Sequence, residues 1–332
     1  MVTLPNGKTI RFLACLLVAL AAVPFIGDTY TLKLVTRMIV LALFGMSLDL
    51  LIGYTGLVSF GHAAFFGLAA YVLQLYAPES EPANLLIALP ISLGGVAIAA
   101  TLIGMLVVRT KGIYFIMVTL AFAQMMFFFF HDSPIAGGSD GAYIWFKPVL
   151  ALSGLTLLDL DDRATMYYFA LVCLVGCYIG LVIVLRSPFG EVIQGIKINE
   201  HRMRALGYNT YLFKLVSFVI SAMVAALAGF LFACIDGYVS PDLLGWRESG
   251  IGLVIVILGG MGTLYGPVIG AIALIVIEEL LRDRAITGVF ADHWQILMGG
   301  FIIAVVLLLK NGLAGFRWPL ARRTMGVKGE PQ

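Results

Sequence analysis

The chain has 332 residues with a formal net charge of +2, and 61% of its residues are hydrophobic against 12% charged. Since about a quarter of the residues of soluble domains are charged, this composition excludes that class, and the small net charge gives no reason to expect a nucleic-acid partner. The chain is predicted to be an all-α polytopic membrane protein, because a β-barrel would show short alternating segments in place of long apolar runs.

Apolar segments recur along the whole chain, and most have the roughly 17–25 residues that a helix needs to cross a bilayer. The first, at 12–27, resembles a signal peptide, but the many later segments favour an uncleaved first helix. The others lie near 34–53, 56–76, 85–108, 113–131, 165–185, 213–235 and 293–309. We predict one transmembrane domain over residues 1–332, with about 8–10 transmembrane helices and glycine-rich broken segments.

The segment that follows residue 48 carries several polar groups at membrane depth. A carboxylate in an apolar span is a functional candidate by default, and small or hydroxyl residues let helices approach and hydrogen-bond. Ser59 and His62 are spaced to share one helical face. Two interpretations stay open, a discontinuity that lines a pore and tight helix packing with a satisfied histidine. The candidate translocation-path residues here are Asp49, Gly53, Gly56, Ser59, Gly61 and His62.

Basic residues indicate the orientation of the chain, because cytoplasmic loops are enriched in Lys and Arg. They gather beside Arg109 and Lys111, in a central polar loop, and in the tail at 311–332. We expect these regions and both termini to be cytoplasmic. The acidic, turn-rich segment at 132–164 is expected to face outward.

The central polar loop occupies residues 187–211. Ser187 is placed to cap a helix that begins with a proline, and apolar residues recur at helical spacing from Val192 to Ile196. Gly207 then offers a left-handed stop. The pattern predicts a short amphipathic helical hairpin, and it favours a docking surface for another protein over a simple solvated loop.

The apolar stretch at 250–281 contains a second glycine-rich interruption, which breaks a helix. Paired glycine-interrupted segments, here this one and the one near Gly53, point to a translocation path. A cytoplasmic tail requires this stretch to count as an even number of crossings, as a re-entrant or double half-helix element would. Glu278 and Arg282 are spaced for an interfacial ion pair. The further translocation-path candidates are Gly260, Gly262, Gly266 and Pro267.

No motif for bond-breaking chemistry appears in the sequence. There is no Gly-x-x-x-x-Gly-Lys-Ser/Thr phosphate loop and no His-Glu-x-x-His motif, and the four histidines are scattered. The four cysteines lie in apolar stretches and are interpreted as packing residues. We therefore expect no catalytic residue, no metal site, no cofactor bound by this chain and no hydrolysis of ATP by it.

Four runs, in this order, resemble the branched-chain amino acid ABC transporter permeases, and in particular their LivM-like subunit. They are GYTGLVSFGHAAFFGLAAY from residue 53, RTKGIYFIMVTLAFAQM at 109–125, GGSDG at 137–141 and GGMGTLYGPVIGA at 259–271. The central loop resembles the coupling loop of that family, although Lys197, Ile198 and His201 stand where a run richer in Arg and Glu is expected.

The resemblance implies many transmembrane helices with the pore at a subunit interface in a bacterial inner membrane. It implies a homologous LivH-like second permease, two cytoplasmic ATPase subunits that use the ATP, and a periplasmic binding protein. The implied function is import of branched-chain or related amino acids; the alternatives are a permease for urea or short amides, or a stand-alone secondary transporter. The residues implied in coupling to an ATPase are Gly190, Glu191, Lys197, Glu200, Ala205, Leu206 and Gly207.

Overall fold

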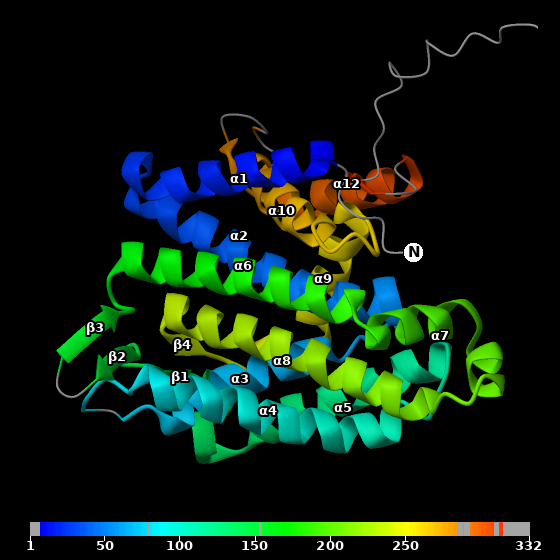
Figure 1. Ribbon diagram of the computed structural model, residues 1–332. Coiled ribbons are helices and arrows are strands. Elements are labelled where there is room, and N and C mark those ends of the chain that lie inside the picture. The colour runs from blue at the N-terminus through cyan, green and yellow to red at the C-terminus, as the bar shows by residue number, and fades with distance from the viewer. Residues whose placement is uncertain are drawn as a thin grey trace, which may run out of the picture.

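The computed structural model describes residues 7–78, 80–152, 155–284, 288, 293–308 and 312–314. Its helices lie side by side, with short strands at one end of the molecule and α7 at the other (Figure 1). This arrangement confirms the all-α prediction. The helices are α1 (Gly7–Ile26), α2 (Thr29–Asp49), α3 (His62–Tyr76), α4 (Leu85–Val107), α5 (Ile113–Asp132), α6 (Arg163–Arg186), α7 (Pro188–Ala205), α8 (Thr210–Asp236), α9 (Trp246–Gly259), α10 (Gly266–Arg282) and α12 (Trp294–Leu308).

Short elements connect these helices. Strand β1 pairs with β4 and β2 pairs with β3, both antiparallel, and the second pair has a register shift between Leu150 and Ala151. Most of these elements lie in the segment predicted to be a loop at 132–164. They are the π-helical turn η1 (Leu50–Thr55), the 3₁₀ turns η2 (Pro134–Ala136), η3 (Gly138–Asp140) and η4 (Pro241–Leu244), and the strands β1 (Ala142–Tyr143), β2 (Val149–Leu152), β3 (Leu155–Asp159) and β4 (Tyr238–Val239).

Polar side chains cap the starts of α4, α6 and α8. Asn84 accepts a hydrogen bond of 3.0 Å from the backbone two residues on, and Asn209 accepts one of 3.4 Å from the backbone three residues on. Asp162 accepts from the backbone N–H of Thr165 at 3.0 Å, and the hydrogen bonds from Thr165 lower the pKa of this carboxyl. Each cap satisfies an amide that the first turn of a helix leaves unpaired.

Helix α2, continued by η1, forms the centre of the molecule. In its most apolar 18-residue window 89% of the residues are buried, against 22% in α4, 22% in α5 and 28% in α6. The outer helices expose large apolar side chains such as Leu102 and Phe129, which suits a lipid environment. Within the described residues five helical segments are long and apolar enough to cross a membrane. Helix α2 begins at Thr29, before the predicted start at residue 34.

Helices α9 and α10 form an antiparallel pair beside α2. The turn between them is hydrogen-bonded to Asp49, the last residue of α2. Near the end of α10, Glu279 accepts a hydrogen bond of 2.5 Å from Tyr30, at the start of α2. The segment predicted at 250–281 is therefore two helices joined by a break at 260–265. Neither helix is among the five segments long and apolar enough to cross a membrane, and the even number of passes stays a prediction.

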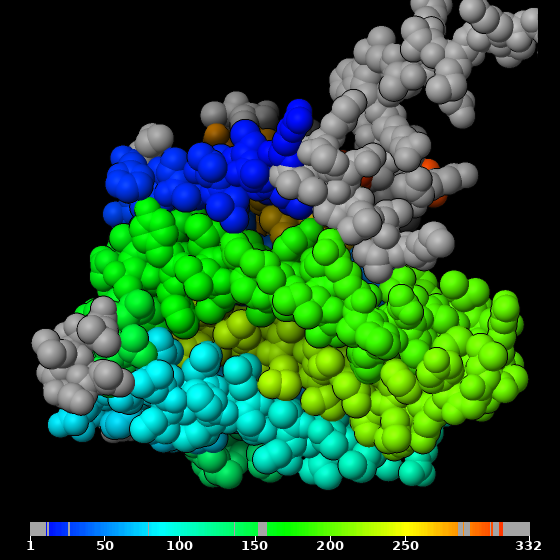
Figure 2. Space-filling view, in the orientation of Figure 1, coloured from blue at the N-terminus to red at the C-terminus, as the bar shows by residue number. Residues whose placement is uncertain are grey.

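The central polar loop folds as α7, which protrudes from one end of the molecule (Figure 2). Ser187 occupies the predicted N-cap position, but its hydroxyl donates to the carbonyl of Val184 at 2.6 Å and does not cap α7. Asn199 has non-helical φ and ψ of −157° and 98°, so α7 consists of two helical parts separated by a kink, in agreement with the predicted hairpin. Gly207 has φ 89°, which confirms the left-handed stop.

The predicted span at 56–76 is only partly helical. Gly56 has φ 79° and ends η1, and α3 begins at His62. Residues 56–61 cross part of the interior without helical structure. Ser59 therefore does not share a helical face with His62, and that prediction is wrong, because the left-handed glycine turns the chain out of the helical path.

Two predictions concern the C-terminal part of the chain. The ion pair between Glu278 and Arg282 is present at 2.6 Å, and the Arg282 guanidinium also lies 4.3 Å from the ring centre of Trp294. The contact with Trp294 joins α10 to α12. The basic tail predicted at 311–332 lies outside the described residues, apart from 312–314.

Candidate functional site

Asp49 is fully buried and holds the turn between α9 and α10. Its carboxylate accepts hydrogen bonds from the backbone N–H groups of Gly262 (2.6 Å) and Leu264 (2.9 Å). This turn has an unfavourable backbone, since Gly260 and Gly262 have φ 112° and 76° and Leu264 has φ 56°. A left-handed leucine is strained and persists only where its surroundings fix it. We interpret Asp49 as the anchor that fixes this turn.

The two glycine-rich segments identified in the sequence are in direct contact at this anchor. Gly53 lies in η1, and a Cβ atom added to it would be 2.6 Å from the Cα of Gly262. A Cβ added to Gly259 would collide with the carbonyl of Gly266, so the two backbones also touch across the turn. The translocation-path candidates gathered here are Asp49, Gly53, Gly260, Gly262, Gly266 and Pro267.

A second polar cluster surrounds His62, which is fully buried at the start of α3. Its Nε2 is 2.8 Å from the Ser221 hydroxyl of α8, and that hydroxyl also donates to the carbonyl of Ser47 in α2. The rings of Phe65 and Phe218 pack edge-on against the imidazole of His62, with ring centroids 5.6 Å and 6.1 Å away. The histidine thus joins three helices, which favours the packing interpretation; a place on the translocation path stays a prediction.

The non-helical segment before α3 is held by hydrogen bonds within itself and by α5, where the Thr119 hydroxyl accepts from the Phe60 amide at 3.2 Å. Gly61 has no room for a side chain, because a Cβ atom would collide with the backbone carbonyl of Thr119. The Ser59 hydroxyl accepts from the Gly61 amide at 3.3 Å, and the Ser249 hydroxyl accepts from the Ala63 amide at 2.9 Å. These hydrogen bonds satisfy backbone groups that the missing helical turns leave unpaired at membrane depth.

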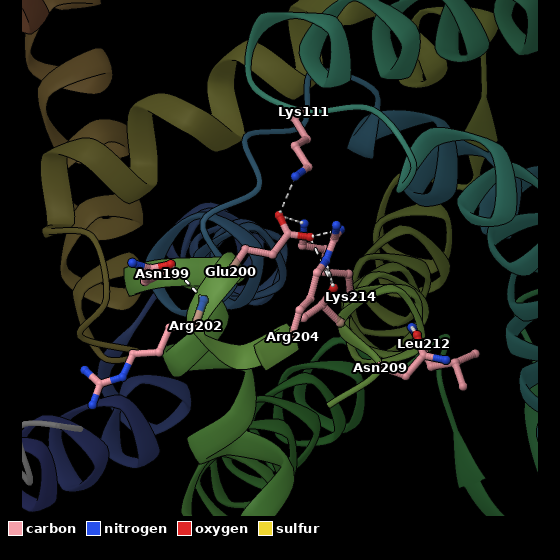
Figure 3. Close-up of polar contacts among 9 residues, drawn as sticks. Lys111, Asn199, Glu200, Arg202, Arg204, Asn209, Leu212 and Lys214 are labelled. Atoms are coloured by element: carbon pink, nitrogen blue, oxygen red, sulfur yellow. Dashed lines mark hydrogen bonds and ion pairs between the residues drawn. The ribbon is translucent and has the colours of Figure 1, made fainter. Parts of the chain in front are cut away.

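A cluster of charges fixes the C-terminal half of α7 (Figure 3). The Glu200 carboxylate lies 3.1 Å from Lys111, 2.8 Å from Lys214 and 2.5 Å from Arg204, whereas Arg202 points away from it. Burial raises the pKa of Glu200, but the hydrogen bonds and charges of Lys214 and Lys111 outweigh it and lower the pKa to about 2. Glu200 therefore ties α7 to the α4–α5 connection and to the start of α8.

The predicted coupling residues divide between the surface and the interior. Gly190 is buried, because α7 lies so close to the end of α6 that a Cβ atom would collide with the backbone of Leu185. The apolar side chains of Ile198 and Leu206 are 81% and 65% exposed, which offers a partner an apolar surface with cations around it. The exposed coupling candidates are Glu191, Lys197, Ala205, Leu206 and Gly207.

Sequence reasoning missed the polar residues of α8. Ser217 lies 2.7 Å from the hydroxyl of Thr55, and Ser221 lies one turn further on beside His62. Their spacing of four residues within an apolar span was the available signal, since it places both on one helical face. Lys214 is also buried within α8, and a lysine in an apolar run indicates a buried partner without revealing that the partner is Glu200.

These clusters connect helices and do not assemble groups for bond-breaking chemistry. Among the described residues, no group of three or more His, Cys, Asp or Glu side chains is placed to hold a metal ion. Most buried polar groups of these clusters form hydrogen bonds to backbone amides, carbonyls and hydroxyls, whereas the buried Nδ1 of His62 has no hydrogen-bond partner among the described residues. Such an arrangement can hold segments together and transmit their movements.

Comparison with known proteins agrees with the sequence resemblance. Residues 30–306 match the family described as "Branched-chain amino acid transport system / permease component". The chain is 30% identical to the high-affinity branched-chain amino acid transport system permease protein LivM of Escherichia coli, over 98% of this chain and 80% of the relative. It is 28% identical to the Salmonella typhimurium LivM over the same shares, and 28% identical to the LivH permease of that organism over 41% of this chain and 43% of the relative. No solved structure matches.

Proposed function

The chain belongs to the family of permease components of branched-chain amino acid transport systems, and we propose that it moves branched-chain amino acids through a bacterial inner membrane. As a member, it is a multi-pass membrane transport subunit and not an enzyme. The substrate class is supported by the names of the LivM relatives, which match almost the whole chain.

We propose that the chain works in a complex with a second, homologous permease, two cytoplasmic ATPase subunits and a periplasmic binding protein. In this complex the partner subunits use the ATP, and this chain binds no cofactor. The observation that carries the proposal is the position of α7, which protrudes from one end and exposes Ile198 and Leu206 beside basic residues (Figure 2). A docking helix needs such a surface and must also be attached rigidly to the rest of the permease. The ion pairs of Glu200 with Lys111 and Lys214 provide this attachment.

The proposed mechanism is a shift between two populations of the permease. Closure of the ATPase subunits on ATP moves the docked α7, and the helices packed against it follow. ATP can shift this equilibrium only to the extent that the two states differ in their contacts with the ATPases. We place α7 and both termini on the cytoplasmic side, in agreement with the clustering of Lys and Arg.

Co-purification tests the proposed complex. The tagged chain is extracted from its native membrane, and the proteins recovered with it are identified by mass spectrometry. We expect a second permease and two ATPase subunits, and uptake of leucine, isoleucine and valine by vesicles that contain the complex. The chain recovered alone, and able to move a solute down an ion gradient, would contradict the proposal, as would uptake of urea or short amides in place of leucine.

Two substitutions in or next to α7 test its role in coupling. Gly207→Pro cannot keep φ 89°, since proline fixes φ near −65°, and Glu191→Lys reverses an exposed charge in the first turn. We expect both to lower substrate-stimulated ATP hydrolysis severalfold while the chain still inserts into the membrane. Glu191→Gln, which removes the charge without reversing it, is the matched control. If both variants kept the wild-type level of substrate-stimulated ATP hydrolysis, α7 would not be the coupling element.

A further inference from the structure

We propose that Lys197 is the positioning residue that carries movements of α7 to the glycine-rich turn between α9 and α10. The inference rests on the proposed function and adds a route through named contacts. Lys197 belongs to the part of α7 that departs from the expected family pattern, and its long side chain points back into the molecule to the backbone of η1.

The first contact of the route joins α7 to η1. The Nζ of Lys197 donates a hydrogen bond of 2.5 Å to the carbonyl of Gly53. Gly53 lies in the last turn of η1, where carbonyls lack partners within the helix and a cation is favourable. The lysine stem passes over Gly56, where an added Cβ atom would be 3.0 Å from its Cγ. The left-handed glycine thus leaves room for the side chain to reach the backbone.

The second contact joins η1 to the turn between α9 and α10. Gly53 touches Gly262 without any side chain between the two backbones. Asp49, one helical turn before Gly53, holds the amides of Gly262 and Leu264. A shift of η1 therefore cannot be absorbed by rotation of a side chain, and the turn must move with it. π-helical turns are often found at functional positions of this kind.

The ammonium group of Lys197 contacts the interior, while its neighbour Ile198 belongs to the exposed docking surface. Asn199 breaks α7 just after Lys197, and Glu200 ties the part beyond the break to Lys111 and Lys214. The exposed apolar residues with which we expect an ATPase to dock, such as Leu206, make no part of the Lys197 contact. Docking and transmission can therefore be tested by different substitutions.

The test uses the complete transporter in lipid vesicles and measures leucine moved per ATP hydrolysed. In Lys197→Met, which keeps the apolar stem and removes the donor, we expect this ratio to fall about tenfold, the change in an equilibrium that loss of one charged hydrogen bond produces. Lys197→Arg keeps a cationic donor and is expected to restore most of the ratio. Lys33→Met is the matched control, because it removes an exposed lysine that pairs with Asp236, at the end of α8 opposite to α7.

A second readout separates transmission from a purely structural role. Spin labels replace Ile198 on α7 and Met261 in the turn, which are 81% and 56% exposed, in a chain whose native cysteines have been replaced. We expect one narrow distance distribution in the wild type and in Lys197→Arg, and a broad one in Lys197→Met. Should Lys197→Met fail to assemble, Lys197→Gln, with a shorter neutral donor, is expected to give intermediate broadening.

The possible results distinguish the inference from the proposed function. A wild-type complex without ATP-driven leucine uptake would contradict the proposed function, and the distance distributions would then still decide whether Lys197 links the two segments. A working wild-type complex with an unchanged transport ratio and an unchanged distribution in Lys197→Met would overturn the inference alone. So would equal losses in Lys197→Met and Lys33→Met.

Discussion

Replacement of Asp49 by asparagine tests whether this carboxylate anchors the turn between α9 and α10. Both carboxylate oxygens accept a backbone hydrogen bond, from Gly262 and Leu264, which is the pattern of an ionised acid. An asparagine of the same shape offers one acceptor and one donor. One of the two buried amides would then face an NH₂ group and lose its partner.

The magnitude follows from that count. An unpaired buried donor costs about 1–3 kcal/mol, so Asp49→Asn should lower the free energy of unfolding by about 2 kcal/mol. Asp49→Ala leaves both amides unpaired and opens a cavity, and it should lower the free energy by about 4 kcal/mol. For a chain of 332 residues, the asparagine effect corresponds to a fall of about 3 °C in the unfolding midpoint.

The assay is thermal unfolding of the purified chain, followed by tryptophan fluorescence. A cysteine placed at Met261, which is 56% exposed in the turn, gives a local readout, because its labelling by a maleimide should accelerate when the turn loses its anchor. Asp132→Asn is the control, since that carboxylate is 71% exposed. An Asp49→Asn chain with the wild-type midpoint and the wild-type labelling rate would refute the anchor.

Three further outcomes are expected. Gly229→Ala should destabilise the chain by about 2 kcal/mol, because its Cβ atom would collide with a facing backbone carbonyl, whereas Gly176→Ala, with open space around it, should be neutral or stabilising in thermal unfolding. The folded pKa of Glu200 is below its ordinary value of 4.5, at about 2, so its contribution to stability is present above pH 4.5 and lost as the pH falls towards 2; Glu200→Gln should abolish that part of an acid titration. In intact cells a cysteine at Trp145 should react with an impermeant reagent and one at Ile198 should not, and the reverse would overturn the proposed orientation.

The sequence predicts the helices well because membrane helices satisfy their own backbone and need only length and apolar side chains. The segments predicted at 85–108 and 113–131 appear almost unchanged as α4 and α5. The prediction fails at residues 56–61, where the composition is as apolar as in a helix. There the conformation of one residue, Gly56 at φ 79°, decides the path, and a glycine in a sequence does not reveal which of its many conformations it adopts.

For most buried polar residues, the sequence does not reveal the hydrogen-bond partner. Asp49 is an obvious candidate as a carboxylate in an apolar span, but its partners are backbone amides 213 and 215 residues away. Every residue except proline carries such an amide, so no residue type marks it as a partner. Ser217 and Ser221 were more accessible, since two hydroxyls one turn apart in an apolar helix indicate a polar face.

The contacts at η1 give the glycine-rich segments a physical role that composition alone did not require. If the glycines near Gly53 and Gly262 served only to let helices approach, an acidic residue beside them would destabilise the fold, because burial of a carboxylate in an apolar environment costs free energy. The structure instead places Asp49 where it fixes a strained turn and places Lys197 where it binds the backbone of η1. Glycine removes the side chains that would separate these backbones, and the two charged residues hold them together. A stiff junction of this kind is what a movement of α7 needs in order to reach the interior of the permease, whereas the lipid-facing helices need only remain apolar.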